Sequence, residues 1–172
     1  MCGIAGIIKT TESSRLALDT ALLQMQAALQ HRGPDRRGAF ITRSHRVGLV
    51  HTRLAILDLS PAGHQPMTTP DGRFTITFNG EIYNFRQLRQ QLEENGAVLR
   101  SLSDTEVILK LYERFGPGCV NQLRGMFAFA IWDDLEKTCF IARDRLGIKP
   151  LYYHIGDYGF TFASEVRSLL AS

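Results

Sequence analysis

The residue with the clearest potential for chemistry is a cysteine that directly follows the initiator methionine. Because Cys2 is small, Met1 can be removed, and the cysteine would then begin the chain with a free amine. A thiol has an ordinary pKa of about 8.5 and an α-amine one of about 7.7–8.0, so part of the amine is unprotonated near neutral pH. The amine could then accept the thiol proton, which gives nucleophilic catalysis without a separate histidine.

The position of Cys2 does not establish this role by itself, because a free cysteine usually packs as a small apolar residue. The chain has three cysteines, and Cys119 and Cys139 lie among apolar neighbours, which favours inert packing for both. Their odd number, their wide spacing and the lack of a clustered Cys/His pattern argue against disulfides, zinc and iron–sulfur sites. We therefore expect reduced thiols and no metal site.

A nucleophile must be held by ordered structure, and the first half of the chain predicts it. Residues 3–8 predict a short buried strand, and helical spacing of apolar residues predicts a helix near 14–30. Short segments rich in β-branched and aliphatic residues predict strands at 38–44, 46–51 and 54–58. Residues 73–78 alternate strictly as a half-buried strand, and Asn79-Gly80 predicts a turn that ends it.

The second half predicts helices followed by strands. One helix runs from Phe85 to the stop at Asn95-Gly96, and Ser103-Asp-Thr-Glu106 is a capping box for another. The core face of this second helix is expected to carry Val107, Ile108, Leu111, Tyr112 and Phe115. Strands are predicted at 126–132, 138–142, 151–154 and 160–163. Strands and helices do not alternate, so an α+β layered sandwich is favoured over a doubly wound parallel sheet.

Size and composition limit the classes of protein. A chain of 172 residues with 44% apolar and 22% charged residues predicts one globular domain. The net charge of +3 is small and the charges are interspersed, which favours neither nucleic acid nor a membrane surface as partner. No secretory signal begins the chain and no apolar run approaches about eighteen residues. We expect a cytoplasmic protein.

Seven motifs occur together in a fixed order: Cys2-Gly3-Ile4-x-Gly6, His31-Arg32-Gly33-Pro34-Asp35, His51-Thr-Arg53-Leu54-Ala-Ile56, Asn79-Gly80-Glu81-Ile-Tyr-Asn84, Ser103-Asp104-Thr105-Glu106, Arg143-Asp144-x-x-Gly147-x-Lys149-Pro150-Leu151-Tyr152 and Phe162-Ala-Ser164-Glu165. The combination closely resembles the glutaminase domain of class II glutamine amidotransferases, and within that group the asparagine synthetase type. The resemblance spans nearly the whole chain, whereas each motif alone is a weak signal.

The resemblance implies a four-layer αββα sandwich of the N-terminal nucleophile hydrolase type, with largely antiparallel sheets. It also implies that Cys2 attacks glutamine, and that the Asn79 side-chain amide and the Gly80 N–H stabilise the oxyanion. Preorganised donors of this kind are what acyl transfer from an amide requires. For the isolated Asn79-Gly80 dipeptide the alternative is a simple hairpin turn. The occurrence of the Asn-Gly-Glu triplet in a chain that also has an N-terminal Cys-Gly favours the catalytic interpretation.

A free amino acid needs a cation for its carboxylate and an anion for its ammonium. The resemblance assigns these roles to Arg53 and Asp104. The remaining wall of the glutamine pocket is implied to come largely from backbone groups of Leu54, Ala55, Ile56, Leu57, Asn79, Gly80 and Glu81. Two alternatives stay open: Arg53 as a surface side chain on a strand edge, and Asp104 as a first-turn acid favoured by the helix dipole.

Other polar residues are candidates for structural roles. His31 or His51 could form a Cys–His dyad with the thiol, but a free amine already supplies a base, so we favour structural roles for both. Residues 31–35 predict an ordered loop near the pocket with no assigned reacting role. The segment 143–150 lacks the arrangement of a phosphate-binding loop, and we interpret it as a structural turn.

Members of the resembled type continue into a domain that binds ATP, and its Ser-Gly-Gly-x-Asp-Ser loop does not occur in this sequence. We expect residues 1–172 to be a glutaminase domain without the synthetase domain, with ATP and magnesium needed only there and no cofactor here. Expected partners are glutamine and a synthetase domain or subunit that accepts ammonia, with a homodimer as one possible assembly. The alternatives are a non-catalytic glutamine-binding or assembly module, and a class II type that feeds a sugar-phosphate isomerase or phosphoribosyl transferase.

Overall fold

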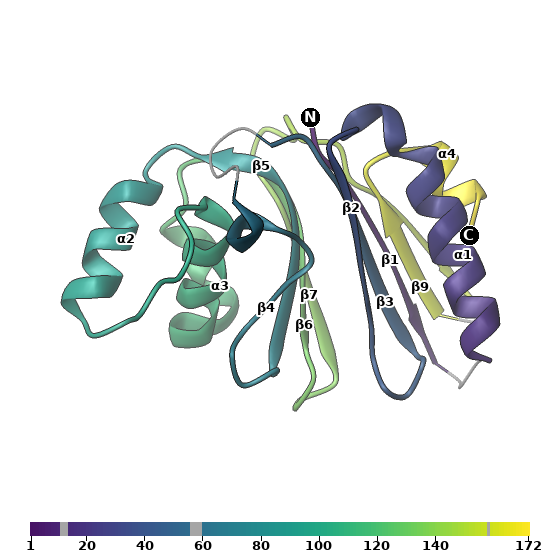
Figure 1. Ribbon diagram of the computed structural model, residues 1–172, viewed down its shortest axis with the longest axis horizontal. Coiled ribbons are helices and arrows are strands. Elements are labelled where there is room, and N and C mark those ends of the chain that lie inside the picture. Colours follow the sequence, from purple (N-terminus) through teal and green to yellow (C-terminus); the bar gives the residue numbers. More distant parts are fainter. Residues whose placement is uncertain (11–13, 56–59, 158) are drawn as a thin grey trace.

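Two antiparallel sheets lie face to face in the middle of the molecule, and helices cover their outer faces (Figure 1). This computed structural model describes residues 1–10, 14–55, 60–157 and 159–172. The order of the layers is helix, sheet, sheet, helix, so the predicted four-layer α+β sandwich is confirmed.

The first sheet has five strands and contains the start of the chain. In spatial order they are β2 (Arg36–Ile41), β3 (Val47–Arg53), β1 (Gly3–Lys9), β9 (Gly159–Ala163) and β8 (Tyr152–Gly156). The first strand, β1, is therefore central and pairs with β3 on one side and β9 on the other. Helices α1 (Arg15–Ala28) and α4 (Val166–Leu170) cover its outer face.

The second sheet has four strands and carries the longest of them. In spatial order they are β4 (Met67–Thr68), β5 (Phe74–Ile82), β6 (Gly125–Asp133) and β7 (Thr138–Arg143). Helices α2 (Phe85–Glu94) and α3 (Asp104–Phe115) cover its outer face. Three short 3-10 turns complete the described elements: η1 (Gln30–Arg32), η2 (Pro61–Gly63) and η3 (Gly116–Asn121).

Period-two alternation places apolar side chains on the inner faces of both sheets. Between the sheets these buried residues pack together: Ile4, Val47, Leu49, Ala128, Ala130, Trp132 and Phe162. On the outer face of the second sheet, Phe74, Ile76 and Phe78 pack against α2 and α3, as their alternation predicted. Burial of each large apolar side chain contributes about 1.5–3 kcal/mol, so the three apolar layers hold the sheets in register.

The local signals at the helix ends act as predicted. Ser14 Oγ accepts from Ala17 N at 3.2 Å where α1 begins, and Ser103 Oγ accepts from Glu106 N at 3.4 Å where α3 begins. The reciprocal half of the capping box differs, because the Glu106 carboxylate accepts from the Ser101 N–H at 2.6 Å instead of turning back to the cap residue.

Several predicted boundaries were wrong. The Asn79-Gly80 pair does not end β5, because both residues pair with β6 and the strand continues to Ile82. The strand predicted at 38–44 ends at Ile41, where the chain turns towards β3. Of the strand predicted at 54–58, residues 54 and 55 are not in a strand and the others lie outside the described residues. Phe115 is 47% exposed, because α3 ends there.

Candidate active site

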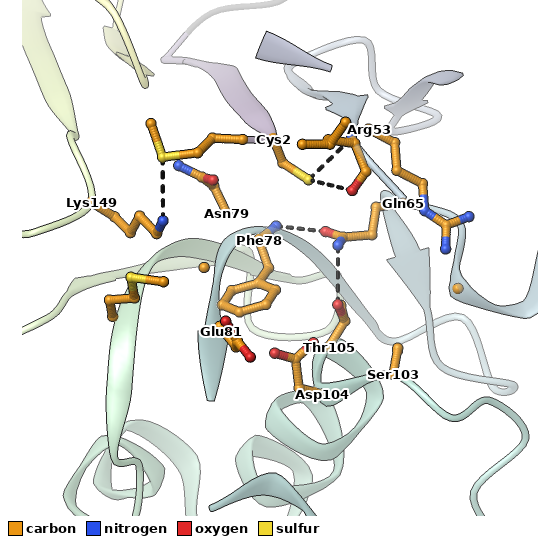
Figure 2. A pocket seen from close by; sticks show the side chains of 15 residues that line it. Cys2, Arg53, Gln65, Phe78, Asn79, Glu81, Ser103, Asp104, Thr105 and Lys149 are labelled. Carbon is orange, nitrogen blue, oxygen red and sulfur yellow. Dashed lines mark hydrogen bonds between the residues drawn. The ribbon is translucent and has the colours of Figure 1, made fainter. Parts of the chain in front are cut away.

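Cys2 lies at the point where the central strand of the first sheet begins. The pair Gly3 and Thr52 opens the ladder between β1 and β3, which fixes the backbone directly after the thiol. The Cys2 sulfur contacts the backbone of Leu54, accepting from its N–H at 3.4 Å and donating to its carbonyl at 3.6 Å (Figure 2). The thiol is therefore positioned by strand pairing and by two contacts from the chain that follows β3.

Side chains from both ends of the sequence also hold this start. Arg32 Nε donates to the Cys2 carbonyl at 2.9 Å, and its Nη1 lies 2.9 Å from Glu165 Oε1. Ser164 Oγ accepts from the Ile4 N–H at 3.0 Å. The motifs at 31–35 and 162–165 thus meet around the first residues of β1, which gives both a positioning role that sequence reasoning did not assign.

Burial, the largest influence, raises the pKa of the Cys2 thiol, against the hydrogen bond from Leu54 N–H, which lowers it. A thiol in this state needs a base nearby to become a nucleophile. Burial raises the pKa of the other two thiols as well, to about 11 for Cys119 and to about 12 for Cys139. Both pack against apolar residues, which is consistent with the predicted inert roles.

Neither histidine forms a dyad with the thiol in the described structure. His51 Nε2 contacts the Phe78 carbonyl at 3.1 Å, and burial lowers the pKa of His51 to about 3, so its ring is neutral. His31 Nε2 lies 2.9 Å from Glu165 Oε1. Both histidines therefore support the structure around Cys2, as favoured from the sequence.

Cys2 opens onto a cavity of about 180 Å³ between the two sheets and the start of α3 (Figure 2). The predicted site residues that line it are Cys2, Arg53, Leu54, Asn79, Gly80, Glu81 and Asp104. Ala55 does not line it, and its N–H donates instead to Asp35 Oδ2 at 2.8 Å. Ile56 and Leu57 lie outside the described residues. Segments that are far apart in sequence thus bring most of the predicted pocket together.

The Asn79 side chain supplies a buried donor to this cavity. It is 2% exposed, and its Nδ2 has no hydrogen-bond partner among the described residues. An unsatisfied buried donor costs about 1–3 kcal/mol, so this amide is available to an acceptor that enters the cavity. A carbonyl oxygen or oxyanion of a ligand fits that requirement.

Gly80 is a glycine because strand β6 passes close to it. A Cβ at this position would lie 2.3 Å from the Met126 carbonyl oxygen and 2.7 Å from Phe127 Cα. Any side chain would therefore push β5 away from β6. The glycine is needed to keep the backbone N–H next to Asn79 in a paired strand, and the hairpin-turn alternative is wrong.

A buried cation and a buried anion line the same cavity from different elements. Arg53, 8% exposed at the end of β3, donates from Nη1 to the Ser60 carbonyl at 3.3 Å. Asp104, 5% exposed at the start of α3, accepts from Ile82 N at 3.0 Å through Oδ2. Burial raises the pKa of Asp104 to about 6, against the hydrogen bond from Ile82. Arg53 is therefore not a surface side chain, and Asp104 faces the cavity besides starting a helix.

Sequence reasoning missed other lining residues: Met1, Gly63, Gln65, Phe78, Ser103, Thr105, Met126 and Lys149. Lys149 belongs to a motif that was interpreted only as a turn; it is 5% exposed, and its Nζ donates to Met1 Sδ at 3.4 Å. Gln65 gave no signal, because its contacts are with residues distant in sequence. A resemblance of local motifs does not indicate such contacts.

The described residues contain no group of three or more histidine, cysteine or acidic side chains arranged to hold a metal ion. In the same part of the chain, no helix is both long and apolar enough to span a bilayer.

Comparisons with known proteins agree on one family. The family model for the glutamine amidotransferase domain matches residues 1–172. A protein of Methanocaldococcus jannaschii named as a glutamine-hydrolysing asparagine synthetase is 40% identical over 190 residues, covering 99% of this chain and 35% of that protein. The glutamine-hydrolysing asparagine synthetase 1 of Bacillus subtilis is 40% identical over 173 residues, covering 100% of this chain and 27% of that protein.

Among solved structures, glutamine phosphoribosylpyrophosphate amidotransferase of Bacillus subtilis has the same fold. The TM-score is 0.77 at 24% sequence identity, covering 99% of this chain and 43% of that chain. This chain spans about a third or less of the curated relatives, and its match to them runs from end to end. The sequence, the fold and the family model therefore agree that the chain belongs to the glutamine amidotransferase domain family.

Proposed function

We propose that this domain hydrolyses glutamine to glutamate and ammonia through a γ-glutamyl thioester on Cys2. One observation carries the proposal: a positioned thiol and an unsatisfied buried amide donor line the same cavity as a buried arginine and a buried aspartate. Arg53 would pair with the α-carboxylate of glutamine and Asp104 with its ammonium, which directs the side-chain amide towards Cys2. Leu54 and Glu81 would complete the wall.

The chemistry begins once Met1 is removed, because with Met1 in place the nitrogen of Cys2 is a weakly basic peptide nitrogen. Met1 is 57% exposed, so an aminopeptidase can reach it. The freed amine accepts the thiol proton, and the sulfur attacks the side-chain carbonyl carbon of glutamine. As the S–C bond forms, the C=O π bond opens and negative charge collects on oxygen, where Asn79 Nδ2 and Gly80 N–H donate.

Collapse of the tetrahedral intermediate breaks the C–N bond. The protonated amine of Cys2 gives its proton to the leaving nitrogen, which departs as ammonia, and the thioester remains. Water then adds to the thioester carbon with the amine as base, the C–S bond breaks, and the thiol recovers a proton as glutamate leaves. Every proton that the α-amine takes is returned, so the cycle needs no metal ion and no redox partner.

The ammonia would be used by an amidation domain, in the same polypeptide or on a separate subunit. The support is that two relatives are named as asparagine synthetases that hydrolyse glutamine, and this chain corresponds to about a third or less of each. ATP and magnesium would be needed there. A reducing cytoplasm would keep the Cys2 thiol free.

Intact mass and a covalent probe test the proposal. The purified protein should lack the methionine residue, and a glutamine analogue with a chloroketone in place of the amide should add once, at Cys2, with loss of chloride. Cys2→Ala should take no adduct, whereas Cys139→Ala should take one. A processed protein that releases no glutamate and takes no adduct would instead support a glutamine-binding or assembly module.

A further inference from the structure

The outer edge of β5 carries the backbone groups that face the cavity. Strand β6 pairs with the whole of β5 on one side, but β4 pairs on the other side only at Thr75 and Ile76. In an antiparallel strand the N–H groups of alternate residues point to the same edge. The edge that β4 leaves open therefore presents the N–H groups of Phe78, Gly80 and Ile82.

Side chains occupy two of these three donors. The Phe78 N–H donates to Gln65 Oε1 at 2.6 Å, and the Ile82 N–H donates to Asp104 Oδ2 at 3.0 Å. Further back on the same edge, the Phe74 N–H donates to Thr69 Oγ1 at 3.0 Å. Each side chain acts where a neighbouring strand would have supplied a carbonyl.

The donor between the two occupied ones is Gly80. Gly80 lies opposite Phe127 of β6, and Phe127 directs both of its backbone groups away from β5: its N–H donates to Asp144 Oδ2 at 3.2 Å and its carbonyl accepts from Asp144 N at 2.8 Å. The Gly80 N–H therefore points to the cavity side. Gln65 and Asp104 bracket a single open donor in this stretch of β5.

Gln65 is placed for this task by the way that β4 begins. The ladder between β4 and β5 ends at the pair Met67 and Ile76, and the next N–H on that edge of β5, that of Phe78, is met by the Gln65 side chain. The Gln65 backbone is seated against β2, where an added Cβ on Gly38 would lie 1.9 Å from the Gln65 carbonyl oxygen. From this fixed point its side chain spans two elements, because Nε2 donates to Thr105 Oγ1 at 3.0 Å (Figure 2).

We propose that Gln65 is a positioning residue that ties the oxyanion edge of β5 to the first turn of α3. Its two hydrogen bonds fix Phe78 relative to Thr105, and each of these residues is adjacent to a proposed site residue, Asn79 or Asp104. The bridge thus sets how far the oxyanion donors lie from the carboxylate that holds the substrate ammonium. This inference rests on the proposed function, since it concerns the geometry of that reaction.

Gln65→Leu tests the bridge, because leucine keeps much of the side-chain volume and has neither the acceptor nor the donor. Small displacements of catalytic groups cost up to about a hundredfold in rate, so kcat for glutamine hydrolysis should fall about 10- to 100-fold. Glutamine binding uses Arg53 and Asp104, so KM and the inhibition constant of the product glutamate should change by less than about threefold.

Thr69→Val is the matched control, because it removes a side-chain acceptor from the same edge of β5, away from the cavity. Its kcat should stay within about twofold of the wild-type value, even where its melting temperature falls as much as that of Gln65→Leu. If Gln65→Leu keeps the wild-type kcat, or both variants lose kcat in step with melting temperature, the positioning role is wrong. A wild-type protein without hydrolysis would instead overturn the proposed function.

Thr105→Val serves as a second variant, needed most if Gln65→Leu does not fold. It removes one end of the bridge and keeps the shape of the buried side chain, which is 2% exposed. We expect kcat to fall about threefold, less than for Gln65→Leu because the bond to Phe78 remains. An unchanged kcat in a folded Thr105→Val protein, or a change confined to KM, would contradict the bridge.

Discussion

The strand that follows the proposed nucleophile and the strand that carries the proposed oxyanion donors are built in opposite ways. Strand β1 is central in its sheet, pairs on both sides and is clamped at its start by Arg32 and Ser164. Strand β5 pairs along its length on one side only, and side chains replace a strand on the other. A nucleophile needs immobility, whereas an oxyanion site needs donors that the fold has left without acceptors.

This difference has an energetic consequence. No described side chain of β1 is a buried donor or acceptor without a partner, while β5 carries Asn79 Nδ2 without one. In the clamp on β1, the buried Nη2 of Arg32 also lacks a partner. An unsatisfied donor costs about 1–3 kcal/mol, which the fold tolerates because packing on both faces of the second sheet holds β5 in place. Substitutions on β5 should therefore affect the rate more than stability, and those at the start of β1 should affect both.

The largest effect is expected where the two strands meet the substrate. Cys2→Ala removes the proposed nucleophile and should lower the rate of glutamate release at least about 10⁴-fold. Cys139→Ala removes a thiol of raised pKa that lies in the apolar layer, so its rate should stay within about twofold. A coupled glutamate assay on both variants measures this. If both variants lose the rate of glutamate release to a similar extent, the loss is not specific to Cys2, and the comparison of β1 with β5 does not describe the reaction.

Asn79→Ala tests the β5 side alone. Loss of one oxyanion donor lowers kcat by about 10²–10³-fold, and we expect a value in that range from steady-state kinetics with glutamine. Because Asn79 Nδ2 has no described partner to lose, the free energy of unfolding should fall by less than about 1 kcal/mol.

Asn95→Ala is the control, because the Asn95 amide donates to Gln91 O at 2.7 Å at the exposed end of α2. Its kcat should match that of the wild type. If Asn79→Ala lowers the free energy of unfolding in urea by several kcal/mol, then the Asn79 amide is structural, and the contrast between β1 and β5 fails.

Asp104 lies at the far end of the open edge of β5, and the pH dependence of glutamine binding tests its proposed role. Its carboxylate must be ionised to pair with an ammonium, and its pKa in the fold is about 6. Glutamine should therefore bind the Cys2→Ala protein about tenfold more weakly at pH 5 than at pH 7, as measured by calorimetry. Asp104→Asn should bind glutamine weakly at both pH values, with a ratio near one.

The same carboxyl predicts an opposite effect on stability. The folded state holds its proton up to about pH 6 and the unfolded state only to about 3.8, so Asp104 favours folding as the pH falls from 6 to 3.8. At neutral pH the buried charge opposes folding. At pH 7, Asp104→Asn should then unfold at a higher urea concentration than the wild type, with a free energy of unfolding that is larger by up to about 3 kcal/mol. This difference between the two proteins should disappear below pH 4. A less stable variant at pH 7 would contradict this.

Local signals in the sequence were sufficient for most of the fold. Serine caps predicted the starts of α1 and α3, and strict alternation predicted that Phe74, Ile76 and Phe78 share one face of β5. The prediction of a half-buried strand was wrong, because the opposite face, with Thr75 and Thr77, is buried between the sheets. The Asn79-Gly80 pair failed as a turn signal. Its glycine is required because the Met126 carbonyl, 46 positions along the chain, lies close to it in the paired strand, and not because of a turn. Turn propensity is local, and pairing with β6 overrides it.

The site divides in the same way. Cys2, Arg53 and Asp104 were predicted because the motifs that contain them resemble those of a known family. The fold brings all three to one cavity. Gln65 and Arg32 act through hydrogen bonds to residues 13 and 30 positions away. Gln65 lies in none of the seven motifs, and the motif that contains Arg32 gave it no role. Positioning residues are defined by tertiary contacts, so they become visible only when strand β5 and the start of β1 have been placed.

The smallest expected effect probes the clamp on β1. Glu165→Gln keeps the shape of the side chain and removes the charge that pairs with Arg32 at 2.9 Å, where the arginine side chain is 8% exposed and the carboxylate 19%. The Arg32 bond to the Cys2 carbonyl should loosen, lowering kcat about threefold, and stability at pH 7 should fall by about 0.5–1.5 kcal/mol.

Burial opposes ionisation of Glu165, but hydrogen bonds from Arg32 and His31 outweigh it, so its pKa in the fold lies below the ordinary 4.5. The stabilisation is therefore present above pH 4.5 and disappears as the pH falls through that lowered value, so the urea curves of variant and wild type should converge in acid. Curves that stay equally far apart at all pH values would show that the carboxylate acts by packing and that the ion pair does not hold β1.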